Sequence, residues 1–241
     1  MDDKQSNPEV ILEFKGACVE LKKLNGSVLH DVSFMIRRGE LLLMQVDNAE
    51  FVSVLGDMAE GLIESKQGVV LFRGKDWKTM SADQLNNHRA VIGRVFDTDL
   101  WLHGKDLEEN ILLCGRHHER CSSDVLKKEA HELARLFGFG ELPAGLPEQA
   151  QPGVLIRAAY VRAFLEQPDL LILENPLREE YDLFTTLLHA VHEAQERGAA
   201  IMWIETDSTI WGDARIKASQ GVRIEHARFY EALKEDHGAT V

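Results

Sequence analysis

The chain has 241 residues, of which 44% are hydrophobic and 28% are charged, and this is enough apolar material for one sizeable core. Its formal net charge of −13 at pH 7 argues against nucleic acid or an anionic membrane surface as a direct ligand. Three cysteines do not suggest a disulfide framework and fit a reducing compartment.

The first ten residues are polar and acidic, so we expect no signal peptide. No apolar run approaches the roughly 20 residues that a membrane-spanning helix needs. These features predict a cytoplasmic protein.

The N-terminal part of the chain reads as strands over residues 11–21, 28–36 and 41–46. Asn25-Gly26 between the first two is a hairpin signal. The third strand is almost wholly apolar, which predicts burial on both faces.

Residues 39–62 decide the functional prediction. They contain the apolar strand, a short polar loop and a helix over 49–62, which is the βα unit that cradles phosphate in many proteins. The phosphate-binding loop has the pattern G-x-x-x-x-G-K-[ST], and in this frame its defining places fall on Val46, Phe51, Val52 and Ser53. Phe51 makes a left-handed backbone costly, Val52 carries no charge, and only Ser53 retains the hydroxyl that would meet Mg²⁺.

Further elements follow in order. Ser81 and Gln84 predict a capping box for a short helix, and residues 91–96 predict a central strand. Residues 107–138 are helical, with Ser123-Asp124 as the cap of a helix over 125–137, and 139–153 form a loop with three prolines. The rest of the chain is predicted to contain, in order, a helix over 154–166, a buried strand over 170–173, a helix over 179–197 closed by Gly198, and strands over 200–205 and 221–225.

This alternation predicts a largely parallel α/β sheet with an antiparallel β part at the N-terminal end. We find no internal repeat or linker, so we expect a single domain over 1–241 that ends without a further regulatory domain.

Several short segments stand in an order that resembles one family. They are Val28–Ser33 with Arg38-Gly39-Glu40, the hairpin at 68–76, residues 92–96 with 108–111, Arg162-Ala163, and 168–173 leading to Pro176. Together they resemble the ATP-binding subunit of ABC transporters, from about residue 11 to 225. The resemblance implies a P-loop NTPase-like ABC ATPase fold, in which approximately 107–166 form a small helical lobe that contacts the membrane subunit.

The same resemblance identifies replaced residues at each reactive place. Asp97 stands for the Q-loop glutamine, Glu174 for the Walker B aspartate, Asn175 for the catalytic glutamate and Thr206 for the switch histidine. An amide such as Asn175 cannot accept a proton as a general base. The D-loop reads Arg178-Glu179-Glu180-Tyr181, and of the signature segment at 150–154 only Gly153 remains. In addition, no aromatic residue lies between Phe14 and Phe34 to stack on adenine.

We therefore predict a non-catalytic, ABC-ATPase-like protein with no cofactor, whose vestigial nucleotide site comprises Val46, Phe51, Val52, Ser53, Gly153 and Glu174. Its expected partners are an ABC transporter membrane subunit, an active ABC ATPase subunit or both, at the cytoplasmic face of the membrane, in a homo- or heterodimer. The alternative is a degenerate subunit that still binds nucleotide and supports transport beside an active ATPase. A third possibility is a stand-alone regulator that senses a cation or metabolite in the altered cleft.

Two smaller constellations have a functional and a structural interpretation. One is a set of carboxylates around the cleft: Asp47, Glu50, Asp97, Glu174, Glu205 and Asp207. They could form a cation site or a socket for a basic segment of a partner, but we favour a solvated acidic rim. The other is the set Cys114, His117, His118 and Cys121, whose spacing would place the four side chains on one face of a helix. They are a candidate Zn²⁺ site, but we favour an ordinary polar helix face.

Overall fold

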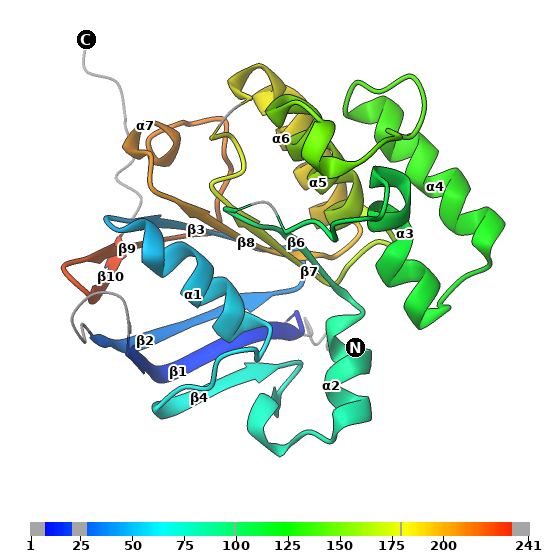
Figure 1. Cartoon of the computed structure of the whole chain (residues 1–241). Helices are drawn as coiled ribbons and strands as arrows, with labels where there is room; N and C mark the ends of the chain where they lie inside the picture. The colour runs from blue at the N-terminus through cyan, green and yellow to red at the C-terminus, as the bar shows by residue number, and fades with distance from the viewer. Residues whose placement is uncertain (1–7, 21–27, 99, 179, 233–241) are drawn as a thin grey trace, which may run out of the picture.

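The computed structural model describes residues 8–20, 28–98, 100–178 and 180–232. Within these residues the strands form one ten-stranded sheet in the order β5-β4-β1-β2-β10-β9-β3-β8-β7-β6 (Figure 1). The strands are β1 (Val10–Glu20), β2 (Val28–Arg37), β3 (Leu41–Val46), β4 (Gln67–Phe72), β5 (Lys75–Asp76), β6 (Ile92–Val95), β7 (Leu170–Glu174), β8 (Ala200–Glu205), β9 (Gln220–Glu225) and β10 (Arg228–Ala232). The predicted fold class is confirmed.

The sheet has an antiparallel and a parallel part. β1 pairs antiparallel with β2 and β4, whereas β9, β3, β8, β7 and β6 are parallel to one another. The predicted hairpin turn at Asn25-Gly26 lies outside the described residues. β10, which the sequence did not predict, pairs antiparallel with β9 and contacts β2, and it thereby joins the two parts.

β6 lies at the edge of the sheet, so the prediction of a central strand over 91–96 was wrong. Its buried residues reflect a helix packed against it rather than a second neighbouring strand. A Cβ atom on Gly93 would lie 1.8 Å from the carbonyl oxygen of Ala163, so the backbone of that helix lies directly on the strand.

The helices are α1 (Ala49–Ala59), α2 (Ala82–Arg89), α3 (Leu107–His118), α4 (Ser123–Leu136), α5 (Pro152–Phe164), α6 (Phe184–Glu196) and α7 (Ser208–Trp211). They divide between the two faces of the sheet, because alternate residues of a strand point to opposite faces. Leu41 and Leu43 of β3 belong to the core that contains α3–α6, and Leu42 and Met44 to the core around α1. In Figure 1, α1 lies between the antiparallel part of the sheet and β3.

Several helix ends differ from the prediction. α1 ends at Ala59, because Gly61 takes a left-handed backbone (φ +65°). The capping box of α2 is present as predicted, whereas the cap of α4 is Ser122, whose side chain accepts from the N–H of Val125. α5 begins at Pro152, since proline suits the first turn of a helix.

The segment after β7 also differs. The predicted helix over 179–197 begins only at Phe184, after a short 3-10 turn at Tyr181–Leu183, and Glu179 of the predicted D-loop lies outside the described residues. Gly198 (φ +96°) closes α6 as predicted, and the short helix α7 was not predicted.

We call α3, α4 and α5 the lobe. These helices pack on one another and share a hydrophobic core with one face of the sheet (Figure 1). In the described part of the chain, no helix has both the length and the apolar character that crossing a membrane requires.

Candidate functional site

The connection between β3 and α1 consists of two residues, Asp47 and Asn48. Asn48 caps the helix by accepting the N–H of Glu50 at 2.9 Å, and the Asp47 carboxylate accepts the N–H of His226 at 2.7 Å. The Asn48 cap favours a helix start directly after it, and the Asp47 bond ties this connection to the turn between β9 and β10. No residue is left to form a wide loop between the strand and the helix.

The predicted loop residues therefore lie in the strand and the first turns of α1. Val46 ends β3, and Phe51 and Val52 are 2% and 0% exposed, packed in the core between the two parts of the sheet. Ser53 is half-buried, and its carbonyl oxygen accepts a hydrogen bond from Arg94 at 3.2 Å.

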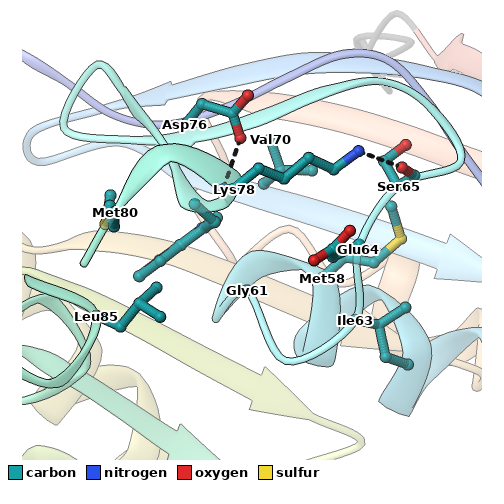
Figure 2. A pocket seen from close by; sticks show the side chains of 11 residues that line it. Met58, Gly61, Ile63, Glu64, Ser65, Val70, Asp76, Lys78, Met80 and Leu85 are labelled. Carbon is teal, nitrogen blue, oxygen red and sulfur yellow. Dashed lines mark hydrogen bonds between the residues drawn. The ribbon is translucent and has the colours of Figure 1, made fainter. Parts of the chain in front are cut away.

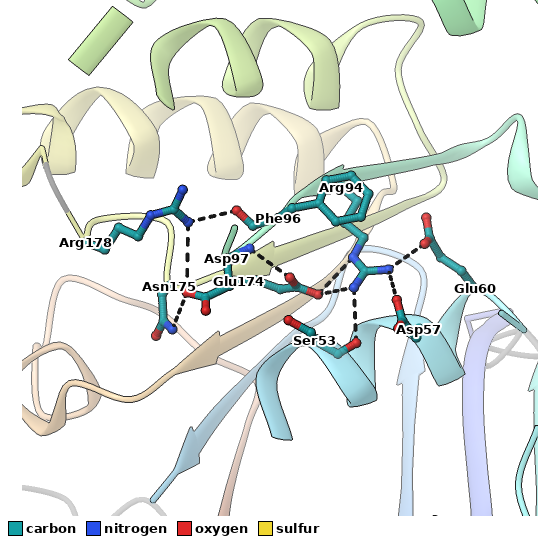
Figure 3. Close-up of polar contacts among 9 residues, drawn as sticks. All are labelled: Ser53, Asp57, Glu60, Arg94, Phe96, Asp97, Glu174, Asn175 and Arg178. Carbon is teal, nitrogen blue, oxygen red and sulfur yellow. Dashed lines mark hydrogen bonds and ion pairs between the residues drawn. The ribbon is translucent and has the colours of Figure 1, made fainter. Parts of the chain in front are cut away.

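Arg94 on β6 connects three carboxylates (Figure 3). Its guanidinium donates to Glu174 at 2.8 Å, to Asp57 at 2.9 Å and to Glu60 at 2.7 Å. The Arg94 side chain is 2% exposed and that of Glu174 1%. We call Arg94, Asp57, Glu60 and Glu174 the Arg94 cluster; it brings β6, β7 and α1 together.

The electrostatics of the cluster follow from this burial. Burial raises the pKa of Glu174 to about 7, against the lowering effect of Arg94, and burial also raises the pKa of Glu60. Burial opposes the charge of Arg94 as well, yet the carboxylates of Glu60 and Glu174 raise the pKa of the guanidinium above its usual value. The cluster thus combines a permanent cation with two carboxylates, Glu60 and Glu174, whose pKa values are raised above those of carboxylates in water.

The other oxygen of Glu174 accepts the backbone N–H of Asp97 at 2.9 Å. Both carboxylate oxygens of this residue, which the resemblance matches to the Walker B aspartate, are therefore in contact with groups of the chain itself.

Asp97, Asn175 and Thr206 lie at the ends of β6, β7 and β8, and the structure brings them together. The Asn175 amide nitrogen donates to Asp97 at 2.7 Å, and its oxygen accepts the Thr206 N–H at 2.8 Å and the Thr206 hydroxyl at 3.0 Å. Asn175 has a left-handed backbone (φ +40°) and is 7% exposed. We call these three residues the loop-end network.

Gly153 lies apart from this network, in the first turn of α5. A Cβ atom on Gly153 would lie 2.0 Å from Oε1 of Glu180, so this carboxylate covers the start of the helix. Glu180 also pairs with Arg157 of the same helix at 3.0 Å. The N–H groups of a helix N-terminus attract anions, and here the chain supplies one.

The predicted acidic set separates into different environments. Glu174 and Glu205 are buried, and Glu205 accepts the Trp203 indole N–H at 2.9 Å. Asp47 and Asp207 accept backbone N–H groups, as caps do. Among the described residues, no group of three or more His, Cys, Asp or Glu side chains is placed to hold a metal ion.

The Cys/His set does not share one helix face. α3 ends at His118, and Glu119 takes a left-handed backbone (φ +48°), so Cys121 lies beyond the helix. Cys121 contacts Glu166, and the rings of His117 and His118 pack edge to face. This expectation of one face was wrong because the helix stops one turn early.

The role of Arg94 was not predicted from the sequence. Two signals were present: an arginine within an apolar strand, and a glycine inside α1. A Cβ atom on Gly56 would lie 2.1 Å from Glu174 Oε1 and 2.6 Å from Arg94 Nη2, so the glycine makes room for the ion pair. A glycine that costs helix stability in an interior turn is a sign of such a close approach.

A separate hollow of about 160 Å³ lies between the end of α1, β4 and α2 (Figure 2). Its walls include Met58, Val70 and Leu85, and at its rim the Lys78 ammonium donates to the Ser65 carbonyl at 2.6 Å. None of its lining residues belongs to the Arg94 cluster or the loop-end network.

Comparisons with known proteins agree with this architecture. No family model matches the chain. It is 30% identical to the methionine import ATP-binding protein MetN of Rhizobium johnstonii over 149 residues (62% of this chain and 41% of that protein). It is 28% identical to the oligopeptide transport ATP-binding protein OppD of Bacillus subtilis over 203 residues (77% and 53%). The solved dimeric structure of MJ0796, a bacterial ABC transporter cassette, superposes with a TM-score of 0.79 at 17% identity, covering 92% of this chain and 98% of that one.

The chain is a relative of ABC transporter ATP-binding domains and has their fold. A second solved structure, the ATP-binding subunit of an ABC transporter, superposes on the chain with a TM-score of 0.77 at 21% identity, covering 92% of this chain and 90% of that one. The domain spans about half the length of the curated relatives that it matches.

Proposed function

We propose that this ABC-type domain is a non-catalytic, structural or regulatory subunit of an ABC transporter or a related ABC ATPase complex, in which nucleotide binding is lost or very weak. The observation that carries the proposal is the position of Arg94, whose guanidinium contacts Glu174, Asp57, Glu60 and the Ser53 carbonyl.

These residues do not fit a magnesium–triphosphate. A hard cation binds carboxylate and hydroxyl oxygens, but both oxygens of Glu174 are already bonded to Arg94 and to the Asp97 N–H. Oε1 accepts two hydrogen bonds from Arg94, so a metal ion at this oxygen would have to displace a buried guanidinium, and breaking such a buried pair costs about 3–5 kcal/mol.

The first turn of α1 gives independent support. Phosphate-binding loops present backbone N–H groups and a lysine to the anion. Here Phe51 and Val52 are buried in the core, Glu50 lies in the same turn, and Asp47 lies just before the helix. A carboxylate about 4 Å from a phosphate oxygen contributes roughly 4 kcal/mol of repulsion at intermediate dielectric.

The loop-end network supports the absence of turnover. The amide of Asn175 is not a general base; it donates a hydrogen bond to Asp97 and accepts one from Thr206. Asp97 and Thr206, two further residues that the resemblance matches to reactive positions, are therefore both bonded to Asn175.

In this proposal the domain acts by binding protein, at the cytoplasmic face of the membrane, where it contacts a membrane subunit, an active ABC ATPase or both. The relatives named as import and transport ATP-binding proteins support this class of partner.

The alternative is a subunit that binds nucleotide weakly and supports transport beside an active ATPase. It is favoured by the names of the relatives, which are all ATP-binding proteins, and by the retained Ser53.

Thermal unfolding with and without Mg-ATP tests the proposal. A ligand at 100 times its Kd stabilises a protein by about 2.7 kcal/mol, so a functional site produces a clear shift at millimolar ATP. We expect no shift, whereas an active ABC ATP-binding domain measured alongside shifts. Mg²⁺ without nucleotide is the control for a simple cation effect.

The outcomes separate the candidates. A shift together with ATP hydrolysis by the isolated chain contradicts the proposal. A shift without hydrolysis favours the alternative of a nucleotide-binding partner subunit.

A further inference from the structure

Two guanidinium groups and two aromatic rings form a continuous stack where the lobe meets the sheet. The Cζ atom of Arg94 lies 4.4 Å from the centre of the Phe96 ring, and that of Arg162 lies 5.7 Å from the same ring. Arg162 also lies 4.4 Å from the centre of the Trp101 ring. We call Arg94, Phe96, Arg162 and Trp101 the guanidinium–aromatic stack.

The stack joins two different parts of the molecule. Arg94 belongs to β6 and is fixed by the carboxylates of α1 and β7, whereas Arg162 belongs to α5 of the lobe. Phe96 and Trp101 lie on the segment that leaves β6 toward α3. A flat guanidinium over a ring face is a favourable contact that strengthens when water is excluded, and Trp101 is only 8% exposed.

Hydrogen bonds fix the same segment. Arg162 donates to the carbonyl of Leu100 at 2.8 Å, and Arg178 donates to the carbonyl of Phe96 at 2.8 Å. The N–H of Asp97 is bonded to Glu174. Leu100 thus contacts α5. Phe96 and Asp97 contact the loop that follows β7 and the end of β7 (Figure 3).

We propose that the guanidinium–aromatic stack, anchored by the Arg94 cluster, holds the lobe in a single orientation against the sheet without any ligand. This inference rests on the proposed function, in which the site binds no nucleotide. The Arg94 and Arg162 side chains then order the lobe against the sheet, as a bound ligand orders two parts of other proteins.

The distance between two spin labels tests the proposal in the full chain. One label is placed at Val125→Cys on α4 and one at Lys75→Cys on β5, both exposed positions. The accessible cysteines are removed as Cys114→Ser and Cys121→Ser, and Cys18 is buried. The probe is pulsed dipolar spectroscopy with and without Mg-ATP.

We expect one narrow distance distribution that Mg-ATP does not change. Arg162→Leu removes the cation shared by both rings and should widen the distribution about twofold. Arg162→Lys keeps the charge but not the flat group, and should widen it less. Arg135→Leu, which removes an exposed arginine from α4, is the matched control and should leave it narrow. Circular dichroism establishes that each variant is folded.

A broad distance distribution in the labelled protein with an unsubstituted stack, or a narrow one in both Arg162 variants, overturns the proposal that the stack holds the lobe in one orientation. Either result leaves the proposed function intact. A shift of the distance distribution on addition of Mg-ATP overturns both the fixed, ligand-independent orientation of the lobe and the proposed function.

Discussion

At the scale of single residues, Arg94 is the most consequential side chain of the site. It is buried, it lies at the edge strand of the sheet, and it neutralises carboxylates from α1 and β7. Buried ion pairs add little net stability compared with apolar side chains, but removing one partner leaves an uncompensated charge. Stability measurements on variants of Arg94 therefore test the ion pairs of the Arg94 cluster. Glu205, a buried carboxylate outside this cluster, is tested separately below.

Arg94→Met should lower the free energy of unfolding by about 3–5 kcal/mol at pH 8, because it leaves Glu174 buried without a cation. Urea denaturation measures the change. Arg135→Met, on the exposed side of α4, should change it by less than about 0.5 kcal/mol. Adding Glu174→Gln to Arg94→Met should restore part of the loss; no restoration would mean that the charge of Glu174 is not the cause.

Glu205 gives the domain a pH-dependent stability. Burial raises the pKa of Glu205 to about 7, although the hydrogen bond from Trp203 favours the ionised carboxylate. The folded state therefore binds this proton more tightly than the unfolded state, and the resulting stability is lost as the pH rises through about 7. Between pH 5.5 and pH 8 the free energy of unfolding should fall by about 2 kcal/mol through this group.

Glu205→Gln keeps an acceptor for Trp203 and should remove this part of the pH dependence. Denaturation at both pH values measures the difference between the variant and the original chain. Glu132→Gln, at an exposed position of α4, is the control. An equal pH dependence with Gln at 205 would rule Glu205 out as its source.

At the scale of elements, local signals locate helices and strands well and locate their ends less well. The cap of α4 is an example, because Ser122 and Ser123 are adjacent and both suit the role. The side chain of Ser122 accepts from Val125, which makes Ser123 the first residue inside the helix. β6 is another example, since an apolar run marks a covered strand without saying whether a strand or a helix covers it.

Ser122→Ala should lower the free energy of unfolding by about 1 kcal/mol, because the N–H of Val125 loses its acceptor. Ser123→Ala should change it by less than about 0.5 kcal/mol, since alanine suits a helical position. Thermal or urea denaturation of the two single variants compares neighbouring serines directly. The reverse order of effects would move the helix start to the position that the sequence predicted.

At the scale of the whole molecule, the sheet brings Asp97, Glu174, Asn175 and Thr206 together at the ends of β6, β7 and β8, where the chain bonds to itself. The Arg94 cluster joins β6, β7 and α1, the loop-end network joins the ends of β6, β7 and β8, and Glu180 covers the start of α5. Tyr181 also donates to Asp207 at 2.6 Å, which links the loops after β7 and β8.

This arrangement predicts that Mg-ATP does not dimerise the isolated domain, because the carboxylate of Glu180 lies where α5 would receive an anion from a second copy. Size-exclusion chromatography with light scattering should give the same mass with and without Mg-ATP. A solved relative forms a dimer, so an active cassette serves as the positive control. A doubled mass only in the presence of Mg-ATP would favour the nucleotide-binding alternative.

The sequence by itself determined the order of the main elements, although not β10 and α7, and the fold class. It also revealed the unusual residues at Val52, Asp97, Glu174, Asn175 and Thr206. Periodicity, caps and turn residues are local signals, and each reports the environment of its own segment. Only the tertiary structure decided that Arg94 pairs with Glu174, 80 residues away, and that Asn175 bonds to Asp97, 78 residues away. Such partners are decided by which strand ends meet at one edge of the sheet, and no local pattern carries that information.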